Sequence, residues 1–355
     1  RAFSQWGTMR RIALGLIGLM FSFSALAEEP PIVEVPDIDE TGFQAFIAEV
    51  KAEALADGIS KATLDAAFAD IKPIRKVVHH DRNQPEERMT FDRYLKIVLS
   101  GKRIEMGRLK LQNNLELLQQ VEDKYGVPKE VIVGIWGIET RYGAITGNIP
   151  LIPAVATLAF DKRRSAFFKK QLMAALQMID KGYADLSIMK GSWAGAMGQP
   201  QFIPTSYMHW AQDWDGDGKR DIWTNEGDVF ASIGNYLADN GWARGEPWGF
   251  EVTVPETSAI AIDGLMGLEK PSCRAMKADV TKQLPLKDWG KLGLTRKDGT
   301  PIGEGEHLAH LVIPDGTKGR AFLVHHNYKT VLTYNCAHLY GLAVGVLSDG
   351  IKAAH

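Results

Sequence analysis

Apolar residues recur at helical spacing in the N-terminal and central parts of the chain. Phe43, Ile47 and Val50 begin the pattern, and an amphipathic run extends over 94–121. Such a periodicity predicts helices that bury one apolar face and expose the other. The same spacing predicts further helices over 128–142, 165–180, 228–240 and 339–351. Gly143 suits a left-handed cap at the end of the first of these.

Beyond Trp248 the spacing changes to the two-residue alternation of strands. Turn-forming residues separate several strand-like segments, at 250–254, 259–262, 308–313, 320–325 and 329–334. We therefore predict an α+β fold that is mainly helical. Its parts are a helical region over 41–247 with a core and an additional lobe, a small antiparallel β-domain over 248–333 and a C-terminal core helix over 334–355.

The N-terminal segment has the pattern of a signal peptide. A basic start at residues 9–11 precedes an uncharged apolar run over 12–26, which is shorter than the roughly 20 residues that span a bilayer. We expect cleavage after residue 27, with residues 1–8 lying upstream of the true start and 28–40 forming an extended leader. An uncleaved anchor is the alternative, and no cysteine follows the run to carry a lipid. These features predict an exported, periplasmic protein.

Composition narrows the classes of function. Hydrophobic residues make up 45% of the chain and charged residues 24%, which is ordinary for a globular protein. The formal net charge of −2 gives no indication of nucleic-acid binding. Cys273 and Cys336 could pair in an oxidising compartment or remain free thiols, and the sequence does not decide between these states.

The helix over 128–142 places a carboxyl group near the end of its apolar face. Ile132, Ile135 and Trp136 lie on one stripe, and Glu139 continues that stripe one turn later. Desolvation there and the negative end of the helix dipole both favour a protonated carboxyl group. A general acid working near neutral pH requires that state. The alternative is a glutamate that turns into solvent at a frayed helix end.

Four motifs, in order along the chain, carry a family resemblance. Residues 134–143 read GIWGIETRYG and residues 191–207 read GSWAGAMGQPQFIPTSY. The acidic loop over 213–221 and the tyrosines and asparagine at 334–340 complete the set. Together they resemble the lytic murein transglycosylase B family over most of 40–350. The resemblance implies a lysozyme-like helical core.

The resemblance also implies a reaction. Family members cleave the MurNAc–GlcNAc β-1,4 bond of peptidoglycan without water and leave 1,6-anhydro-MurNAc ends. Glu139 would act first as acid and then as base, without the second carboxylate of ordinary glycosidases, because the muramic 6-hydroxyl is the nucleophile. The positions matching the family's saccharide groove are Ser192, Gln201, Tyr236, Tyr334, Asn335 and Tyr340. A muramidase-type hydrolase and a non-catalytic wall-binding protein remain as alternatives.

The loop that begins at Asp213 has the spacing of an EF-hand. Oxygen ligands are predicted from three aspartates and a main-chain carbonyl, at Asp213, Asp215, Asp217 and Lys219. Thr224 occupies the position where an EF-hand has its bidentate glutamate. The resemblance implies Asp228 as the last ligand, with Glu226 as its competitor. We expect structural calcium here, and an acidic turn without an ion is the alternative.

No other cofactor or nucleotide motif is present in the sequence. The chain has no Walker A sequence and no dinucleotide fingerprint, so no organic cofactor is expected. The expected partners are peptidoglycan glycan strands. Wall-synthesis or wall-remodelling proteins as partners, endolytic or exolytic action, stem-peptide preference and oligomeric state are left open by the sequence.

Overall fold

The computed structural model describes residues 34–83, 89–267 and 280–353. Within these ranges the chain forms two compact units. The helical unit comprises residues 34–247 and 342–353, and the sheet unit comprises residues 248–341. The signal peptide predicted at 1–27, the first part of the predicted leader and Cys273 lie outside the described residues.

The helical unit is built from helices of very different length and burial. Its helices up to the first candidate motif are α1 (Glu40–Ala56), α2 (Lys61–Ala67), α3 (Arg75–Arg82), α4 (Phe91–Val98), α5 (Gly101–Asn113), α6 (Leu115–Tyr125) and α7 (Lys129–Thr140). Those that follow are α8 (Leu151–Phe160), α9 (Ser165–Asp180), α10 (Pro204–Trp210), α11 (Glu226–Asp239) and most of α15 (His338–Lys352). A two-stranded antiparallel sheet pairs β1 (Ile149–Pro150) with β2 (Lys190–Gly191).

The amphipathic run predicted over 94–121 is not one helix. It is divided among α4, α5 and α6, which are separated at Leu99–Ser100 and at Asn114. The Ser100 hydroxyl accepts the main-chain N–H of Arg103 at 3.3 Å and so begins α5. Asn114 ends α5 and precedes α6. The helix predicted over 165–180 is confirmed as α9.

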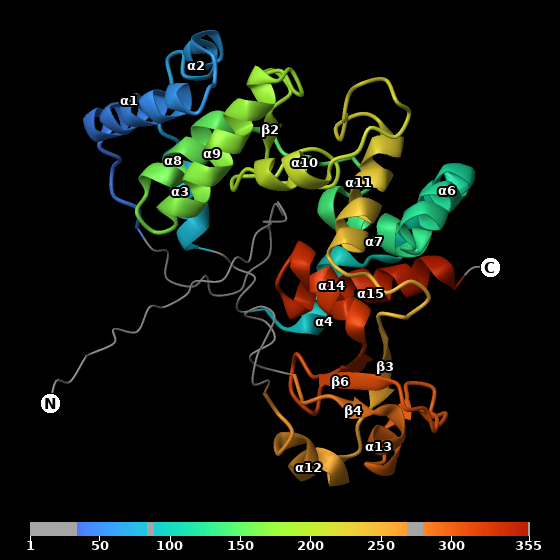
Figure 1. The fold of residues 1–355 in the computed structure, drawn as a ribbon. Helices are drawn as coiled ribbons and strands as arrows, with labels where there is room; N and C mark the ends of the chain where they lie inside the picture. Colours follow the sequence, from blue (N-terminus) through green and yellow to red (C-terminus); the bar gives the residue numbers. More distant parts are fainter. Residues whose placement is uncertain (1–33, 84–88, 268–279, 354–355) are drawn as a thin grey trace, which may run out of the picture. The chain divides into compact units, whose positions relative to one another are not determined.

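Two close helix–helix contacts organise the interior of the helical unit. Helices α8 and α9 run side by side (Figure 1), and nearly all of α8 is buried. Helix α7 meets α15 at a glycine, where an added Cβ on Gly134 would lie only 2.5 Å from the Ser348 hydroxyl. Such close approach leaves no room for a side chain and keeps α7 in the core.

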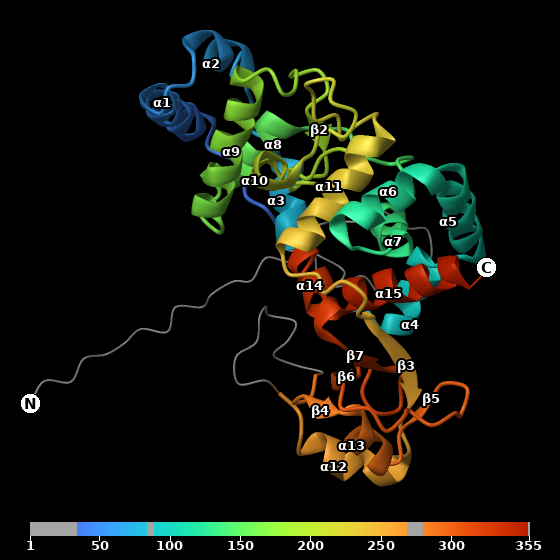
Figure 2. The same ribbon diagram turned by 45° about the vertical axis from the view of Figure 1, so that its right-hand side comes forward.

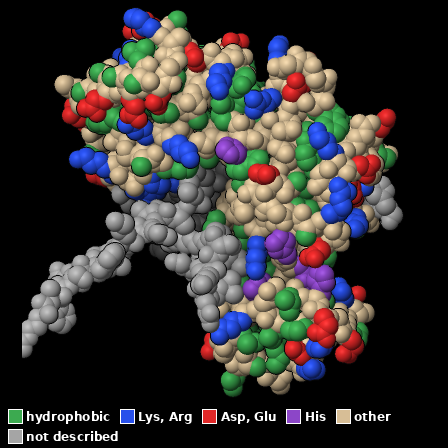
Figure 3. Space-filling model, in the orientation of Figure 1, with side chains coloured by type: hydrophobic (Ala, Val, Ile, Leu, Met, Phe, Trp, Pro, Cys, Tyr) green, Lys and Arg blue, Asp and Glu red, His purple; other side chains and the backbone are tan. Residues whose placement is uncertain are grey.

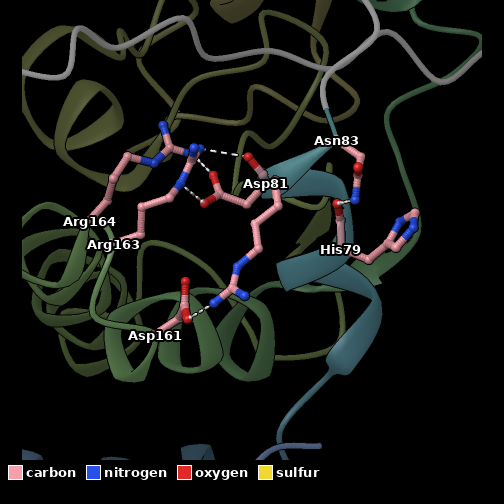
Figure 4. Close-up of polar contacts among 7 residues, drawn as sticks. His79, Asp81, Asn83, Asp161, Arg163 and Arg164 are labelled. Atoms are coloured by element: carbon pink, nitrogen blue, oxygen red, sulfur yellow. Dashed lines mark hydrogen bonds and ion pairs between the residues drawn. The ribbon is translucent and has the colours of Figure 1, made fainter. Parts of the chain in front are cut away.

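An ion-pair cluster joins the end of α3 to the turn between α8 and α9. The Asp81 carboxylate accepts Arg163 Nε at 2.6 Å and a further bond from Arg164, while Arg82 binds Asp161 at 2.7 Å (Figure 4). The Asp81 side chain is 1% exposed. Buried charges such as that of Asp81 are stable only when they are paired. Basic side chains also gather on the surface over α3, α8 and α9 (Figure 3).

The sheet unit contains a five-stranded antiparallel sheet in the order β4-β6-β7-β3-β5 (Figure 2). Its strands are β3 (Gly249–Thr253), β4 (Leu284–Pro285), β5 (Thr295–Arg296), β6 (Leu308–Val312) and β7 (Ala321–Val324). Its helical segments are η2 (Glu256–Ser258), α12 (Ala259–Asp263), α13 (Leu286–Lys291) and α14 (His326–Tyr334). Trp289, Leu311 and Leu323 lie in its buried core.

Two segments predicted as strands are helices. Residues 259–262 form most of α12, where Ile260 is 90% exposed and Ile262 is fully buried. Residues two apart also point in nearly opposite directions on a helix, so a short alternating segment does not distinguish the two structures. Residues 329–334 belong to α14. The predictions of strands at 250–254, 308–313 and 320–325, and of a mainly helical α+β fold with a small antiparallel sheet, are confirmed.

Among the described residues, no single helix is both long and apolar enough to cross a bilayer. The bent pair α14 and α15 meets the criterion only when the two helices are taken together, by length and composition.

Candidate active site

Helix α7 carries Glu139 in its last turn. The helix is buried as far as Thr140, and Glu139 is only 6% exposed. It is therefore not a glutamate turned into solvent. The helix ends before the predicted cap at Gly143, because Arg141 and Tyr142 adopt left-handed backbone conformations with φ of 53° and 60°. Two such residues in succession stop the helix abruptly.

The turn after α7 is fixed by a buried tyrosine. The Tyr142 hydroxyl donates to the main-chain oxygen of Arg103 at 2.7 Å, and Arg103 Nη1 donates to the oxygen of Gly137 at 3.0 Å. Burial raises the pKa of the Tyr142 hydroxyl above its usual value, so the hydroxyl stays a neutral donor. Because these bonds tie the turn to α5 and back to α7, the helix end that carries Glu139 is held on two sides.

The glycine-rich segment 191–207 folds back on itself beside this helix end. The main chains of Met197 and Phe202 exchange two hydrogen bonds, at 2.9 and 3.0 Å. Between them Gln201 adopts a φ of 53°, and its side-chain amide donates to the main-chain oxygens of Thr146 and Gly198 at 3.0 and 2.9 Å. The segment is thus a compact loop that presents Gln201 at a fixed angle.

Direct contacts join this loop to the end of α7. The Thr140 hydroxyl donates to the main-chain oxygen of Gln199 at 2.9 Å. The Ile145 N–H donates to the oxygen of Thr140 at 2.9 Å, and Thr146, the next residue, accepts from Gln201 at 3.0 Å. Glu139 and Gln201, singled out separately in the sequence, therefore belong to one hydrogen-bonded substructure of the helical unit.

Other predicted groove residues of the helical unit have structural contacts. Ser192 is 3% exposed, and its hydroxyl accepts the N–H of Ala196 at 3.1 Å. Tyr236 of α11 is 8% exposed, and its ring lies 5.7 Å from that of Phe202 and 4.5 Å from that of Trp210. Both residues thus support the loop that carries Gln201.

The remaining predicted groove residues belong to the sheet unit. Tyr334 ends α14, and its ring stacks on that of Tyr340 at 6.4 Å with an interplanar angle of 13°. Asn335 follows directly as the C-cap and is 8% exposed. These three residues are brought together within that unit at the α14–α15 junction.

The acidic loop gathers three of its predicted ligands. Carboxylate oxygens of Asp213, Asp215 and Asp217 lie within 4.8 Å of one another. The loop wraps around Asp213, whose carboxylate accepts the N–H groups of Gly216 and Gly218 at 2.7 and 2.8 Å. Three carboxylates at such separations repel one another, and a divalent cation with oxygen ligands would relieve the repulsion. The donor set therefore fits calcium.

The two candidates for the last ligand lie in different surroundings. Asp228 is fully buried, and its carboxylate accepts the N–H groups of Trp214 and Asp221 at 2.7 and 2.6 Å. Burial, with repulsion from nearby aspartates, raises its pKa to about 6 despite these bonds. Glu226 instead binds Lys110 Nζ at 3.2 Å. Each oxygen of Asp228 retains a further lone pair, so this residue is the better placed of the two.

Sequence reasoning missed two residues of this region. Gln199 accepts the Trp136 indole N–H at 2.7 Å and donates to the main-chain oxygen of Trp223 at 2.9 Å. The signal for it was a second glutamine in the same motif. The other is His80 of α3, whose ring stacks on Trp193 at 6.2 Å. Burial lowers the pKa of His80, and nearby Lys76 acts in the same direction.

Known proteins resemble this arrangement over most of the chain. The model of the family described as "Transglycosylase SLT domain" matches residues 42–349. The membrane-bound lytic murein transglycosylase B of Escherichia coli K12 is 30% identical over 263 residues, which are 74% of this chain and 67% of that protein.

Solved structures extend the comparison to the fold. SltB3 from Pseudomonas aeruginosa in complex with NAG-anhNAM-pentapeptide is 40% identical, with a TM-score of 0.79 over 87% of this chain and 79% of that chain. The lytic transglycosylase Slt35 of E. coli in complex with calcium is 28% identical, with a TM-score of 0.71 over 89% of this chain and 94% of that chain.

Proposed function

Because this chain belongs to the family of transglycosylase SLT domains, which are enzymes, we propose that it is a lytic transglycosylase of peptidoglycan. It would cleave the MurNAc–GlcNAc β-1,4 bond without water and leave 1,6-anhydro-MurNAc ends. The relatives support this substrate and product, since SltB3 was solved with a NAG-anhNAM-pentapeptide and with a NAG-NAM-pentapeptide. Peptidoglycan glycan strands are then the partner of the site.

Glu139 would perform both proton transfers. Its protonated carboxyl group gives a proton to the glycosidic oxygen as the bond from that oxygen to the muramic C1 breaks. The resulting carboxylate takes the proton of the muramic 6-hydroxyl as O6 forms its bond to C1, which restores the acid. The nucleophile belongs to the substrate and is already close to C1, so a second carboxylate is unnecessary.

The observation that carries the proposal is the burial of Glu139 in the last turn of an apolar helix, beside the loop that holds Gln201. Burial favours the neutral form of a carboxyl group, and that form is the one able to donate a proton. Ser192, Gln201, Tyr236, Tyr334, Asn335 and Tyr340 are proposed as the saccharide-binding residues. Their amide, hydroxyl and phenol groups suit the hydroxyl and N-acetyl groups of aminosugars.

Product analysis tests the reaction type. Purified sacculi are digested with the protein, and the muramic ends of the released fragments are weighed by mass spectrometry. The proposal predicts anhydro ends that are one water lighter than reducing ends. A predominance of reducing ends would identify a muramidase-type hydrolase, and absence of any release would support a wall-binding protein.

We also propose that the acidic loop binds calcium in a structural role. Asp213, Asp215 and Asp217 would supply carboxylates, Lys219 a main-chain carbonyl and Asp228 the last ligand. Bound calcium neutralises the charge that these groups concentrate. Extracellular modules typically bind calcium with dissociation constants of about 10⁻⁴–10⁻³ M. We therefore expect millimolar calcium to raise the melting temperature and a chelator to reverse the effect.

A ligand variant makes the calcium test specific. Replacement Asp215→Asn removes one charge from the cluster and should abolish the calcium-dependent rise in melting temperature. Glu226→Gln serves as the matched control, because Glu226 binds Lys110, and its calcium response should match that of the parent protein. A melting temperature insensitive to calcium in the parent protein would refute the site.

We propose that the predicted signal peptide over 1–27 directs export of the protein to the periplasm and is then cleaved. The basic start and the apolar run support this interpretation. Expression of the full sequence in a Gram-negative host, followed by fractionation and N-terminal sequencing, should recover periplasmic protein beginning at residue 28. Protein retained in the cytoplasm at full length would contradict the proposal.

A further inference from the structure

Gln199 lies at the junction of three segments of the helical unit. Its side chain contacts Trp136 of α7 and the main chain of Trp223, which follows the acidic loop. Its own N–H donates to the oxygen of Ile222 at 2.8 Å, and its oxygen accepts the hydroxyl of Thr140 at 2.9 Å. Every polar group of this residue is therefore used, two toward α7 and two toward the segment 222–223.

The partners of the side-chain amide fix its orientation. The indole N–H of Trp136 is only a donor, so it requires the amide oxygen of Gln199. The main-chain oxygen of Trp223 is only an acceptor, so it requires the amide nitrogen. An inverted amide would lose both bonds and bring like groups together. Gln199 is 8% exposed, which makes the loss of such bonds costly.

Gln199 also packs against the turn after α7. An added Cβ on Gly143 would lie 2.4 Å from the amide oxygen of Gln199, so the turn is in close contact with this side chain. Trp136 and Thr140, the two residues of α7 that bind Gln199, precede Glu139 by three positions and follow it by one. The contacts therefore bracket the carboxyl group along the helix.

We infer that Gln199 is a positioning residue, which fixes the last turn of α7, and with it Glu139, against the segment that follows the acidic loop. The inference rests on the proposed function, because it gives Glu139 a catalytic role. Gln199 itself transfers no proton. It sets the angle at which the acid meets the glycosidic oxygen, and misplacement of about 1 Å can reduce a rate by about 10²-fold.

The first test replaces Gln199 by an unbranched residue of similar length. Gln199→Met removes both side-chain hydrogen bonds and retains packing. With soluble peptidoglycan fragments as substrate, kcat should fall about 10- to 100-fold while KM stays close to that of the parent protein. The matched control is Gln171→Met. Gln171 is a buried glutamine on α9 that accepts the N–H and hydroxyl of Thr205 at 3.1 and 3.0 Å.

The control separates positioning from stability. Gln171→Met should lower the melting temperature, as Gln199→Met does, but should leave kcat unchanged because Gln171 lies outside the contacts around α7. Equal losses of kcat in both variants, or an unchanged kcat in Gln199→Met, would overturn the inference. If instead Glu139→Gln kept full activity, the proposed function would fail, whatever the result for Gln199.

A third variant tests the fixed orientation of the amide. In Gln199→Glu an ionised carboxylate can still accept from Trp136 but cannot donate to Trp223, whereas a protonated carboxyl group can do both. Burial raises the pKa of such a group above its value of about 4.3 in the unfolded chain. The ionised carboxylate therefore destabilises the folded protein at about pH 7, and this destabilisation is lost as the pH falls toward about 4.3. The melting-temperature gap to the parent protein should therefore narrow at low pH. A gap independent of pH, as expected for Gln199→Met, would contradict the assigned bonds.

Discussion

The ends of α3 and α7 each bury a carboxyl group in the last helical turn, with different consequences. Asp81 of α3 is 2% exposed and is bound by two guanidinium groups, those of Arg163 and Arg164. Glu139 of α7 is 6% exposed and continues a stripe formed by apolar residues such as Ile135 and Trp136. In both turns the helix dipole disfavours a negative charge.

The surroundings decide what each acid can do. The Asp81 carboxylate forms ion pairs with two arginines, and these pairs join α3 to the α8–α9 turn. Glu139 instead continues an apolar stripe, and burial of this kind favours the neutral form of a carboxyl group, which the proposed proton transfers require. The comparison teaches that burial alone does not identify a catalytic acid. The charges that accompany the burial have to be examined as well.

The largest structural effect should follow from breaking the α3 cluster. Asp81→Asn leaves two arginines without their counter-ion and should lower the free energy of unfolding by about 3 kcal/mol. Chemical denaturation measures this loss. Asp161→Asn is the matched control, because the Arg82–Asp161 pair is more exposed, and it should cost about 1 kcal/mol or less. Equal costs for the two variants would contradict the distinction.

A smaller loss of folding stability is expected from a substitution in the first turn of α11. Asp228 accepts two main-chain N–H groups, so Asp228→Asn would place an amide nitrogen against one of these donors. We expect a loss of about 2 kcal/mol in the free energy of unfolding, measured without calcium. Glu226→Gln, in the same turn but at a half-buried ion pair, should cost less than about 1 kcal/mol. A stable Asp228→Asn variant would show that this carboxyl group does not anchor the loop.

The smallest effect on folding stability is expected from a substitution in the first turn of α7, at the opposite end of the helix from Glu139. Glu130 is 9% exposed and lies in the first turn, where the helix dipole favours its charge. Glu130→Gln should lower the free energy of unfolding by less than about 1 kcal/mol and should leave kcat unchanged. Activity assays and denaturation check both expectations. A large loss of kcat would mean that the two ends of α7 do not differ in function.

The sequence predicted elements and motifs whose signals are local. Helix α9 runs over 165–180 as expected, because its apolar spacing and length are typical of a helix. The alternation at 259–262 was misread, because four residues are too few to distinguish a strand from a single helical turn. The run over 94–121 was overextended, because Ser100 and Asn114 are caps only in the context of the fold.

Within the candidate site, long-range partners were beyond the sequence. Glu139 and Gln201 could be singled out because their motifs are contiguous. Gln199 was not, because its role depends on Trp136 and Trp223, which lie 63 and 24 positions away. The same limit applies to the last ligand of the acidic loop, for which the resemblance implied Asp228 with Glu226 as its competitor, because the sequence does not show that Glu226 binds Lys110.

The most direct test of the catalytic role compares two glutamates of one helix. Sacculus solubilisation is measured for Glu139→Gln and Glu130→Gln at equal concentration, with melting temperatures recorded for both. We predict that Glu139→Gln lowers the rate by at least about 10²-fold while keeping its melting temperature, and that Glu130→Gln stays active. Undiminished solubilisation by a folded Glu139→Gln variant would contradict the assignment of Glu139 as the acid and base.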